Sequence, residues 1–224
     1  MSETMQTTRF PGESAAYREA RERLLQSERA LRRQDEQVAA ERRALPPGGP
    51  LPQDYVFHEG DDGRAVSFSD LFGRHGTLLV YSYMFGPSMK QPCASCTSIL
   101  DALDGQVAHV TQRAALVAVA QSPIERILGF ARPRGWRNLR LLSAAGTTYQ
   151  RDYLGEGETG DQFPMLNVFR RDGGLIRHVW GTELLFAPPE PGQDPRHADA
   201  VWPLWNLLDL TPEGRGAFRP SLTY

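Results

Sequence analysis

The chain alternates between short apolar runs and longer stretches in which apolar residues recur at helical spacing. The apolar runs, rich in strand-forming residues, cover residues 55–57, 78–85, 114–120, 139–142, 165–170 and 175–180. After residues 78–85 and again after 114–120, apolar residues three or four positions apart mark one face of a helix. The order strand, helix, strand, helix, strand predicts an α/β fold with parallel strands and helical crossovers. Gly173 and Gly174 between the last two runs predict a hairpin.

The N-terminal part predicts a long helix. Residues 14–44 contain neither Gly nor Pro and are dominated by good helix formers. A narrow apolar stripe repeats every seven residues, at Tyr17, Leu24, Leu31, Val38 and Leu45. Two interpretations stay open: an amphipathic arm that lies on its own domain, and a helix that pairs with a partner subunit, for example in a homodimer.

Breaks in composition divide the chain into three parts. Residues 46–50 (PPGGP) end the helix and form a linker, so residues 1–50 are an N-terminal arm with its linker. Residues 51–182 hold the predicted strands and helices of one domain. Residues 183–224 are rich in Pro and predict an irregular C-terminal extension, in which 201–208 (VWPLWNLL) are apolar enough to pack on the domain.

Bulk composition excludes several classes of function. The 224 residues include 25 basic and 27 acidic side chains, so no overall charge favours nucleic acid or a membrane surface. The N-terminus lacks the basic-then-apolar pattern of a signal peptide, and no apolar run approaches 18 residues. We therefore expect a soluble cytoplasmic protein without nucleic-acid or membrane partners.

The only two cysteines carry the clearest chemistry. Cys93 and Cys96 stand where an apolar strand ends and a helix begins. The unpaired N–H groups and the dipole of a helix start favour a thiolate, which is the species that attacks a disulfide. We predict Cys93 as the nucleophile and Cys96, one turn later on the same face, as the resolving residue. Lys90, the only lysine, is expected to add a nearby positive charge.

Two plainer interpretations of the cysteine pair remain open. A zinc site needs two further ligands from His58, His75, His109, His178 or His197, and none of these forms a second paired motif. The pair is also compatible with two inert, reduced thiols. His178 and His197 are candidates for a position near the site, although surface or hydrogen-bonded histidines are the more common case. No metal and no cofactor are expected.

The order strand, Cys-x-x-Cys helix, strand, helix, Pro-headed strand and hairpin resembles the thioredoxin fold, a central mixed sheet flanked by helices. Nearly the whole chain, the N-terminal arm included, resembles a bacterial thioredoxin-like family of unknown function labelled predicted dithiol-disulfide oxidoreductase. The motifs that carry this likeness are ERRALP, DYVF, YMFGP, PCASC, SPIERI, GWRNLRLLS, PMLNVFRRDG, DPRH and LTPEGRG.

The resemblance implies a substrate groove beside the dithiol. Pro164, which heads a strand, should then have a cis peptide bond and lie across from Cys93, where Phe163 offers backbone groups to a bound chain. Pro92 occupies the position before the first cysteine, where thioredoxins have Trp, and we assign it to the same groove. The predicted partner is a disulfide-containing protein or a small thiol.

The sequence also departs from thioredoxin. The strand at residues 78–85 carries no carboxylate that could serve the resolving cysteine, and the loop from Phe85 to Cys93 is longer than in thioredoxin. The peroxiredoxin motif Pro-x-x-x-Thr/Ser-x-x-Cys is not matched, because Gln91 stands four residues after Pro87. We therefore predict a thiol–disulfide oxidoreductase. The alternatives are a thiol peroxidase-like enzyme and a non-enzymatic interaction or redox-sensing module.

Overall fold

The computed structural model describes residues 9–193 and 199–223. One compact unit ends at Pro46, and a second, larger unit begins at Pro47. The domain boundaries predicted after residues 50 and 182 stay predictions. In the part of the chain that is described, no helix is both long and apolar enough to cross a membrane.

Helix α1 (Ala15–Ala44) dominates the first unit, which confirms the predicted long helix. Its N-cap is Ser14, whose hydroxyl oxygen accepts a hydrogen bond from the backbone N–H of Tyr17 at 3.1 Å. No residue of α1 is buried. The apolar stripe is therefore on the surface, with Leu24 52% and Leu31 65% exposed. Both predicted roles of this helix stay predictions.

The second unit is built on one seven-stranded mixed sheet with the order β2-β1-β5-β4-β3-β6-β7. Its strands are β1 (Val56–Glu59), β2 (Arg64–Ser67), β3 (Thr77–Ser82), β4 (Ala115–Ala120), β5 (Arg140–Ser143), β6 (Met165–Asp172) and β7 (Leu175–Gly181). The three strands β3, β4 and β5 are parallel, whereas β6 is antiparallel to β3 and β7 is antiparallel to β6. Strand β2, which the sequence pattern missed, pairs with β1 across a turn where Gly60 and Gly63 have positive φ angles of 72° and 60°.

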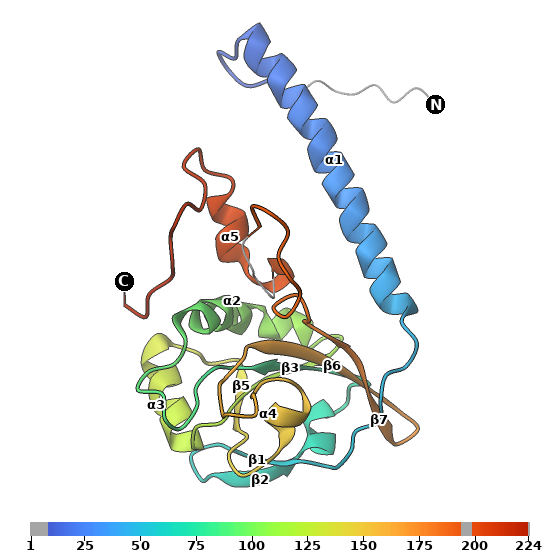
Figure 1. The fold of residues 1–224 in the computed structure, drawn as a ribbon, viewed down its shortest axis with the longest axis vertical. Helices are drawn as coiled ribbons and strands as arrows, with labels where there is room; N and C mark the ends of the chain where they lie inside the picture. Colours follow the sequence, from blue (N-terminus) through green and yellow to red (C-terminus); the bar gives the residue numbers. More distant parts are fainter. Residues whose placement is uncertain (1–8, 194–198, 224) are drawn as a thin grey trace. The chain divides into compact units, whose positions relative to one another are not determined.

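Two apolar clusters cover the two faces of the sheet, because successive strand residues point to opposite sides. On one face, Tyr81 of β3 packs with α2 (Ala94–Val110) and α3 (Ile124–Arg134). On the other face, Val80 packs with the 3-10 helix η1 (Phe68–Phe72) and with the short helix α4 (Tyr149–Asp152). Figure 1 shows the sheet between these helices.

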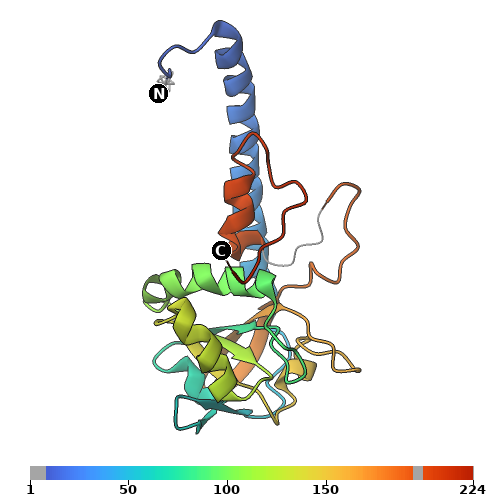
Figure 2. The same cartoon turned by 90° about the vertical axis from the view of Figure 1, so that its left-hand side faces the viewer.

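The C-terminal extension is less irregular than predicted. It contains a 3-10 turn, η2 (Asp199–Val201), and a short helix, α5 (Pro203–Leu208). Both Trp202 and Trp205 are buried in the cluster that also contains residues of α2. The Trp202 indole N–H donates a hydrogen bond to the Ser98 hydroxyl of α2 at 2.7 Å. The apolar stretch thus packs over α2, as Figure 2 shows.

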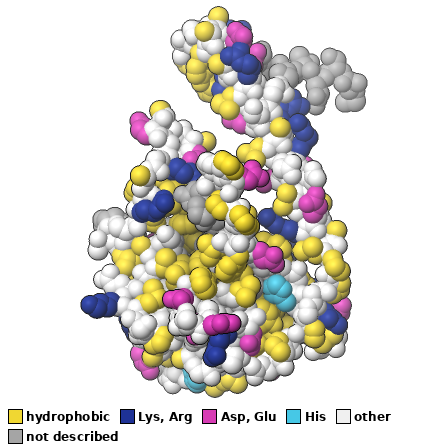
Figure 3. All heavy atoms as spheres, in the orientation of Figure 1, with side chains coloured by type: hydrophobic (Ala, Val, Ile, Leu, Met, Phe, Trp, Pro, Cys, Tyr) yellow, Lys and Arg dark blue, Asp and Glu magenta, His cyan; other side chains and the backbone are white. Residues whose placement is uncertain are grey.

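The order of elements is the one expected from the resemblance: strand β3, the Cys-x-x-Cys helix α2, strand β4, helix α3, and the antiparallel pair β6 and β7. The second unit therefore has a thioredoxin-like fold, and the α/β prediction is confirmed. On the face of the molecule seen in Figure 3, acidic, basic and apolar side chains are interspersed, and neither sign of charge forms a continuous patch among the residues described there.

Candidate functional site

Cys93 is the N-cap of helix α2, at the edge of the sheet where β3 ends. Its backbone N–H donates to the Met84 carbonyl at 3.0 Å, which fastens the helix start to the chain leaving the strand. Its sulfur accepts a hydrogen bond from the backbone N–H of Cys96 at 3.5 Å. The predicted position of the dithiol at a helix start is therefore the position observed.

This environment favours the thiolate form of Cys93. Hydrogen bonds from the Cys96 thiol and from the backbone N–H groups of Cys96 and Ser95 outweigh burial and lower the pKa of Cys93 to about 6. At neutral pH the sulfur is then mostly ionised. The side chain is only partly buried, so this thiolate is within reach of solvent.

Cys96 has the opposite character. It is 1% exposed, and burial, together with its hydrogen bond to Cys93, raises the pKa of the Cys96 thiol well above its ordinary value. One partly exposed thiolate thus stands next to one buried thiol. Both cysteines are free thiols in this structure.

Two tyrosines lie beneath the helix start: Tyr81 in β3 and Tyr83, which directly follows that strand. Tyr83 and Thr97 share a hydrogen bond of 2.8 Å between their hydroxyl oxygens, and the Thr97 hydroxyl donates to the Cys93 carbonyl at 2.8 Å. The Tyr81 hydroxyl is hydrogen-bonded to the Cys96 thiol. Sequence reasoning missed both residues. The available signal was their spacing, since residues two apart in a strand share a face.

One arginine of α3 holds the loop that precedes Cys93. The Arg126 guanidinium donates hydrogen bonds to four backbone carbonyls of this loop, which belong to Gly86, Pro87, Met89 and Lys90, with distances of 3.2 Å for Gly86, Pro87 and Lys90. Its central carbon also lies 4.4 Å from the centroid of the Phe85 ring. The long loop is thus tied to the domain by a side chain that sequence reasoning did not select.

Pro92 is buried directly before the N-cap, and the Lys90 side chain is exposed. The hydrogen bonds at the helix start are the main cause of the lowered pKa of Cys93. The contact of Lys90 within the loop is made by its backbone carbonyl, which accepts a hydrogen bond from Arg126. The role of Pro92 in substrate binding stays a prediction.

The prediction of a cis peptide bond before Pro164 is wrong: no peptide bond among the described residues is cis. The Phe163 N–H donates to the Gly155 carbonyl at 3.0 Å, and its ring packs edge-on against Phe186 with centroids 5.7 Å apart. These contacts hold Phe163 in place before its trans bond to Pro164. One of the backbone groups of Phe163 that the resemblance assigns to a bound chain, the N–H, is therefore already paired.

The segment before β6 nevertheless lies at the same edge of the sheet as the dithiol. Met165 pairs with Ser82 at the end of β3, so Pro164 precedes β6 at the edge where Met84 holds Cys93. A Cβ atom at Gly86 would lie only 3.2 Å from the Gln162 side chain, so this segment packs closely on the dithiol loop. Its function in substrate binding stays a prediction.

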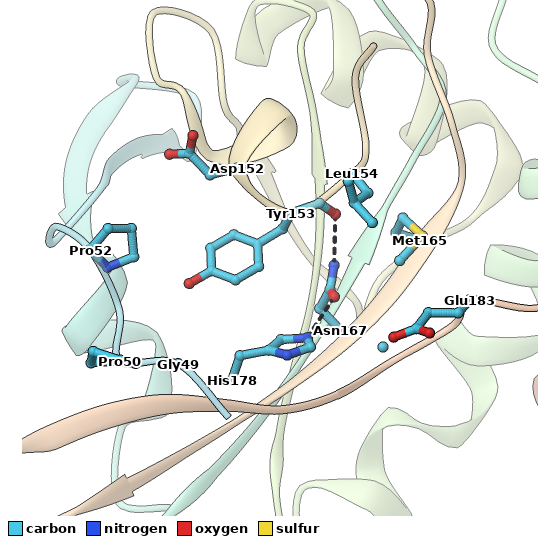
Figure 4. Close-up of a pocket in the computed structure, with 11 residues that line it drawn as sticks. Gly49, Pro50, Pro52, Asp152, Tyr153, Leu154, Met165, Asn167, His178 and Glu183 are labelled. Atoms are coloured by element: carbon cyan, nitrogen blue, oxygen red, sulfur yellow. Dashed lines mark hydrogen bonds between the residues drawn. The ribbon is translucent and has the colours of Figure 1, made fainter. Parts of the chain in front are cut away.

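A separate cavity of about 360 Å³ lies on the opposite face of the sheet (Figure 4). His178 Nε2 lies 2.9 Å from Asn167 Oδ1, and the Asn167 amide donates to the Tyr153 carbonyl at 3.3 Å. His178 is thus hydrogen-bonded in this cavity rather than placed at the dithiol. The other candidate histidine, His197, lies outside the described residues.

The described residues contain no group of three or more His, Cys, Asp or Glu side chains arranged to bind a metal ion. Within them, the two thiols are therefore not joined by the further ligands that a zinc site of the predicted kind requires.

A family model, DUF899, described as "bacterial protein of unknown function", matches residues 6–223. Comparison with curated proteins found no match.

Among solved structures, peroxidoxin BcpB from Mycobacterium tuberculosis is 18% identical to this chain and has a TM-score of 0.48. The match covers 70% of this chain and 94% of that protein. A hypothetical protein from Sinorhizobium meliloti is 18% identical, with coverages of 79% and 91% and a TM-score of 0.45. The exposed lipoprotein thioredoxin Etrx1 from Streptococcus pneumoniae is 13% identical, with coverages of 66% and 98% and a TM-score of 0.41. None of these likenesses is close enough to support a statement about the reaction.

Proposed function

Because the chain belongs to DUF899, a family of bacterial proteins of unknown function, we propose its activity from the site itself: thiol–disulfide exchange through Cys93 and Cys96. The observation that supports this proposal is the difference between the two sulfurs. Cys93 is partly exposed with a pKa lowered to about 6, whereas Cys96 is buried with a raised pKa. Attack on a disulfide needs one accessible thiolate and one protected partner that acts only afterwards.

The exchange proceeds in two steps. In the first, the Cys93 thiolate attacks one sulfur of a substrate disulfide R–S–S–R, a mixed disulfide Cys93–S–S–R forms, and R–S⁻ leaves and takes up a proton. In the second, the Cys96 sulfur loses its proton and attacks the Cys93 sulfur, so that the Cys93–Cys96 disulfide forms and the second R–S⁻ leaves and is protonated. The dithiol is oxidised by two electrons, and the substrate is reduced to two thiols. With an oxidised dithiol and a reduced substrate, the same steps run in reverse.

We assign the substrate groove to the surface around Cys93, with Pro92 on one side and Phe163 and Pro164 on the other. The strand pairing supports this assignment, because Met165 lies opposite Ser82 at the edge of the sheet where α2 begins. The substrate class is a disulfide-containing protein or a small disulfide. A cytoplasmic location is proposed with it, since glutathione and thioredoxin there keep paired thiols reduced.

The test uses the reduced full chain and glutathione disulfide, with products followed by mass spectrometry. Wild-type protein is expected to pass through a glutathione adduct to an internal disulfide and to release two glutathione thiols. Cys96→Ser should stop at the adduct, and Cys93→Ser should form little adduct because Cys96 is 1% exposed. If the wild-type protein consumes no disulfide, the proposed activity is wrong.

Two further arms of the experiment separate the alternative functions. Replacing glutathione disulfide by hydrogen peroxide tests for a thiol peroxidase, which would oxidise the pair faster with peroxide than with the disulfide. A non-enzymatic module would keep its partner and its cellular role in the Cys93→Ser, Cys96→Ser double variant. Pairing of two copies through α1 remains part of the proposal, and sedimentation analysis of Leu24→Glu, Leu31→Glu against the wild-type protein tests it.

A further inference from the structure

Two buried tyrosines, Tyr81 of β3 and Tyr83 directly after that strand, pack against the dithiol helix. Tyr81 and Tyr83 are 0% and 1% exposed and belong to the same apolar cluster as Cys96. The Tyr83 hydroxyl is bonded to Thr97, which in turn holds the carbonyl of Cys93. Tyr83 is thus engaged with the backbone of the helix start, while the Tyr81 hydroxyl meets the sulfur of Cys96.

The second step of the exchange requires a negative charge on a sulfur that has almost no contact with water. Cys96 is 1% exposed, and the strand beneath it, Thr77–Ser82, has the sequence TLLVYS without a carboxylate. A buried thiolate is costly unless a hydrogen-bond donor faces it. The backbone N–H of Met84 supplies one such donor, and the Tyr81 hydroxyl supplies another.

We propose that Tyr81 is the hydrogen-bond donor that stabilises the Cys96 thiolate while Cys96 attacks the mixed disulfide on Cys93. This inference rests on the proposed function. In that step Cys96 loses its proton and its sulfur attacks the sulfur of Cys93. The S–S bond between Cys93 and the substrate sulfur breaks, the Cys93–Cys96 disulfide bond forms, and the departing R–S⁻ takes up a proton. Tyr81 keeps its own proton throughout, so it lowers the energy of the charged sulfur without acting as a base.

The Tyr81 hydroxyl faces the ionisable groups of the two cysteines and of Tyr83. The pKa of the Tyr81 hydroxyl lies far above neutrality, chiefly because the side chain is buried. Cys96, Cys93 and Tyr83 raise this pKa further. The Arg134 guanidinium partly offsets the raised pKa of the neighbouring Tyr83. Tyr81 therefore remains a donor across the pH range in which the dithiol reacts.

The experiment compares Tyr81→Phe with Tyr83→Phe in single turnovers of reduced protein with glutathione disulfide, quenched with acid and analysed by mass spectrometry. Tyr81→Phe should form the glutathione adduct at the wild-type rate but resolve it roughly 10- to 100-fold more slowly, as expected for loss of one hydrogen bond to a charged group. The pH at which resolution becomes fast should also rise. Tyr83→Phe also removes a buried tyrosine hydroxyl, but one that is bonded to Thr97 and not to Cys96. This variant should not accumulate the adduct.

The outcomes separate this inference from the function on which it depends. If Tyr81→Phe resolves the adduct at the wild-type rate with an unchanged pH profile, the role of Tyr81 is wrong although the exchange activity stands. If wild-type protein forms no adduct at all, both are wrong. Should Tyr81→Phe fail to fold, the wild-type sequence is produced with 3-fluorotyrosine, whose more acidic hydroxyl donates more strongly. Faster resolution then supports the inference, and an unchanged rate overturns it.

Discussion

The backbone N–H of Cys96 points at the sulfur of Cys93 from 3.5 Å, while the Cys96 side chain itself is buried beneath the helix start. One residue therefore has two functions in the structure. Its N–H and thiol stabilise the charge on Cys93, and its sulfur is kept away from solvent until a mixed disulfide brings a target next to it. The two cysteines are consequently expected to differ sharply in reactivity.

The first prediction concerns that difference. Iodoacetamide should modify Cys93 in the native protein with an apparent pKa of about 6, and it should modify Cys96 only after unfolding. In Cys96→Ala the largest cause of the lowered Cys93 pKa is removed, so the apparent pKa should move up toward the free-thiol value of about 8.5. The rate of alkylation against pH, with the modified site identified by mass spectrometry, measures both effects. Equal labelling of the two cysteines in the native protein would contradict the assignment of their roles.

The second prediction concerns Arg126, which holds the dithiol loop. Arg126→Ala leaves four loop carbonyls without their guanidinium donor and should lower the free energy of unfolding by about 1–3 kcal/mol. Arg132→Ala on the same helix is the matched control. Its ion pair with Asp61 is on the surface, the two side chains being 58% and 78% exposed, so the loss should be about 0–1 kcal/mol. Urea unfolding of the three proteins measures the difference, and equal losses would show that the loop does not depend on Arg126.

The third prediction concerns the C-terminal extension. Trp202 is 5% exposed and donates to Ser98 of the dithiol helix, so Trp202→Ala should destabilise the second unit by about 3–5 kcal/mol. Leu207 on α5 is 62% exposed and provides the control, since Leu207→Ala should change the stability by about 0.5 kcal/mol or less. Thermal unfolding distinguishes the two. A small effect of Trp202→Ala would mean that the extension contributes little to holding α2.

The sequence predicted those features of the site that depend on local order. The apolar run at residues 78–85 and the helical spacing after Cys96 are local patterns, and together they placed the dithiol at a helix start. The fold followed from the same patterns, because a strand, a crossover helix and a parallel strand leave few topologies open.

Contacts between distant residues could not be predicted in this way. Arg126 reaches carbonyls about 40 residues earlier in the chain, and nothing in its own surroundings marks it out among many arginines. Tyr81 and Tyr83 look like ordinary residues of a buried strand, although a buried tyrosine hydroxyl needs a partner and could have been assigned to the helix above it. Pro164 shows the limit of resemblance, since its peptide bond is trans and the Phe163 before it contacts Gly155 and Phe186.

The fourth prediction concerns His178 in the cavity on the opposite face of the sheet. The Asn167 amide donates to the Tyr153 carbonyl, which turns Oδ1 toward the imidazole and makes His178 Nε2–H the donor. This hydrogen bond persists when the imidazole is protonated. Burial disfavours the protonated form of His178 and lowers its pKa below 6.5, and Glu183 partly opposes this shift.

Unfolding exposes this histidine and restores its ordinary pKa, so the unfolded chain binds the extra proton first as the pH falls. The stability of the wild-type protein should therefore decrease as the pH drops through 6.5, and His178→Gln, which keeps a side-chain amide able to donate to Asn167, should show a shallower decrease. Urea unfolding at several pH values between about 5 and 8 measures the slope, which is independent of any fixed destabilisation by the substitution. Identical slopes for the two proteins would show that His178 carries the same charge in the folded and unfolded states.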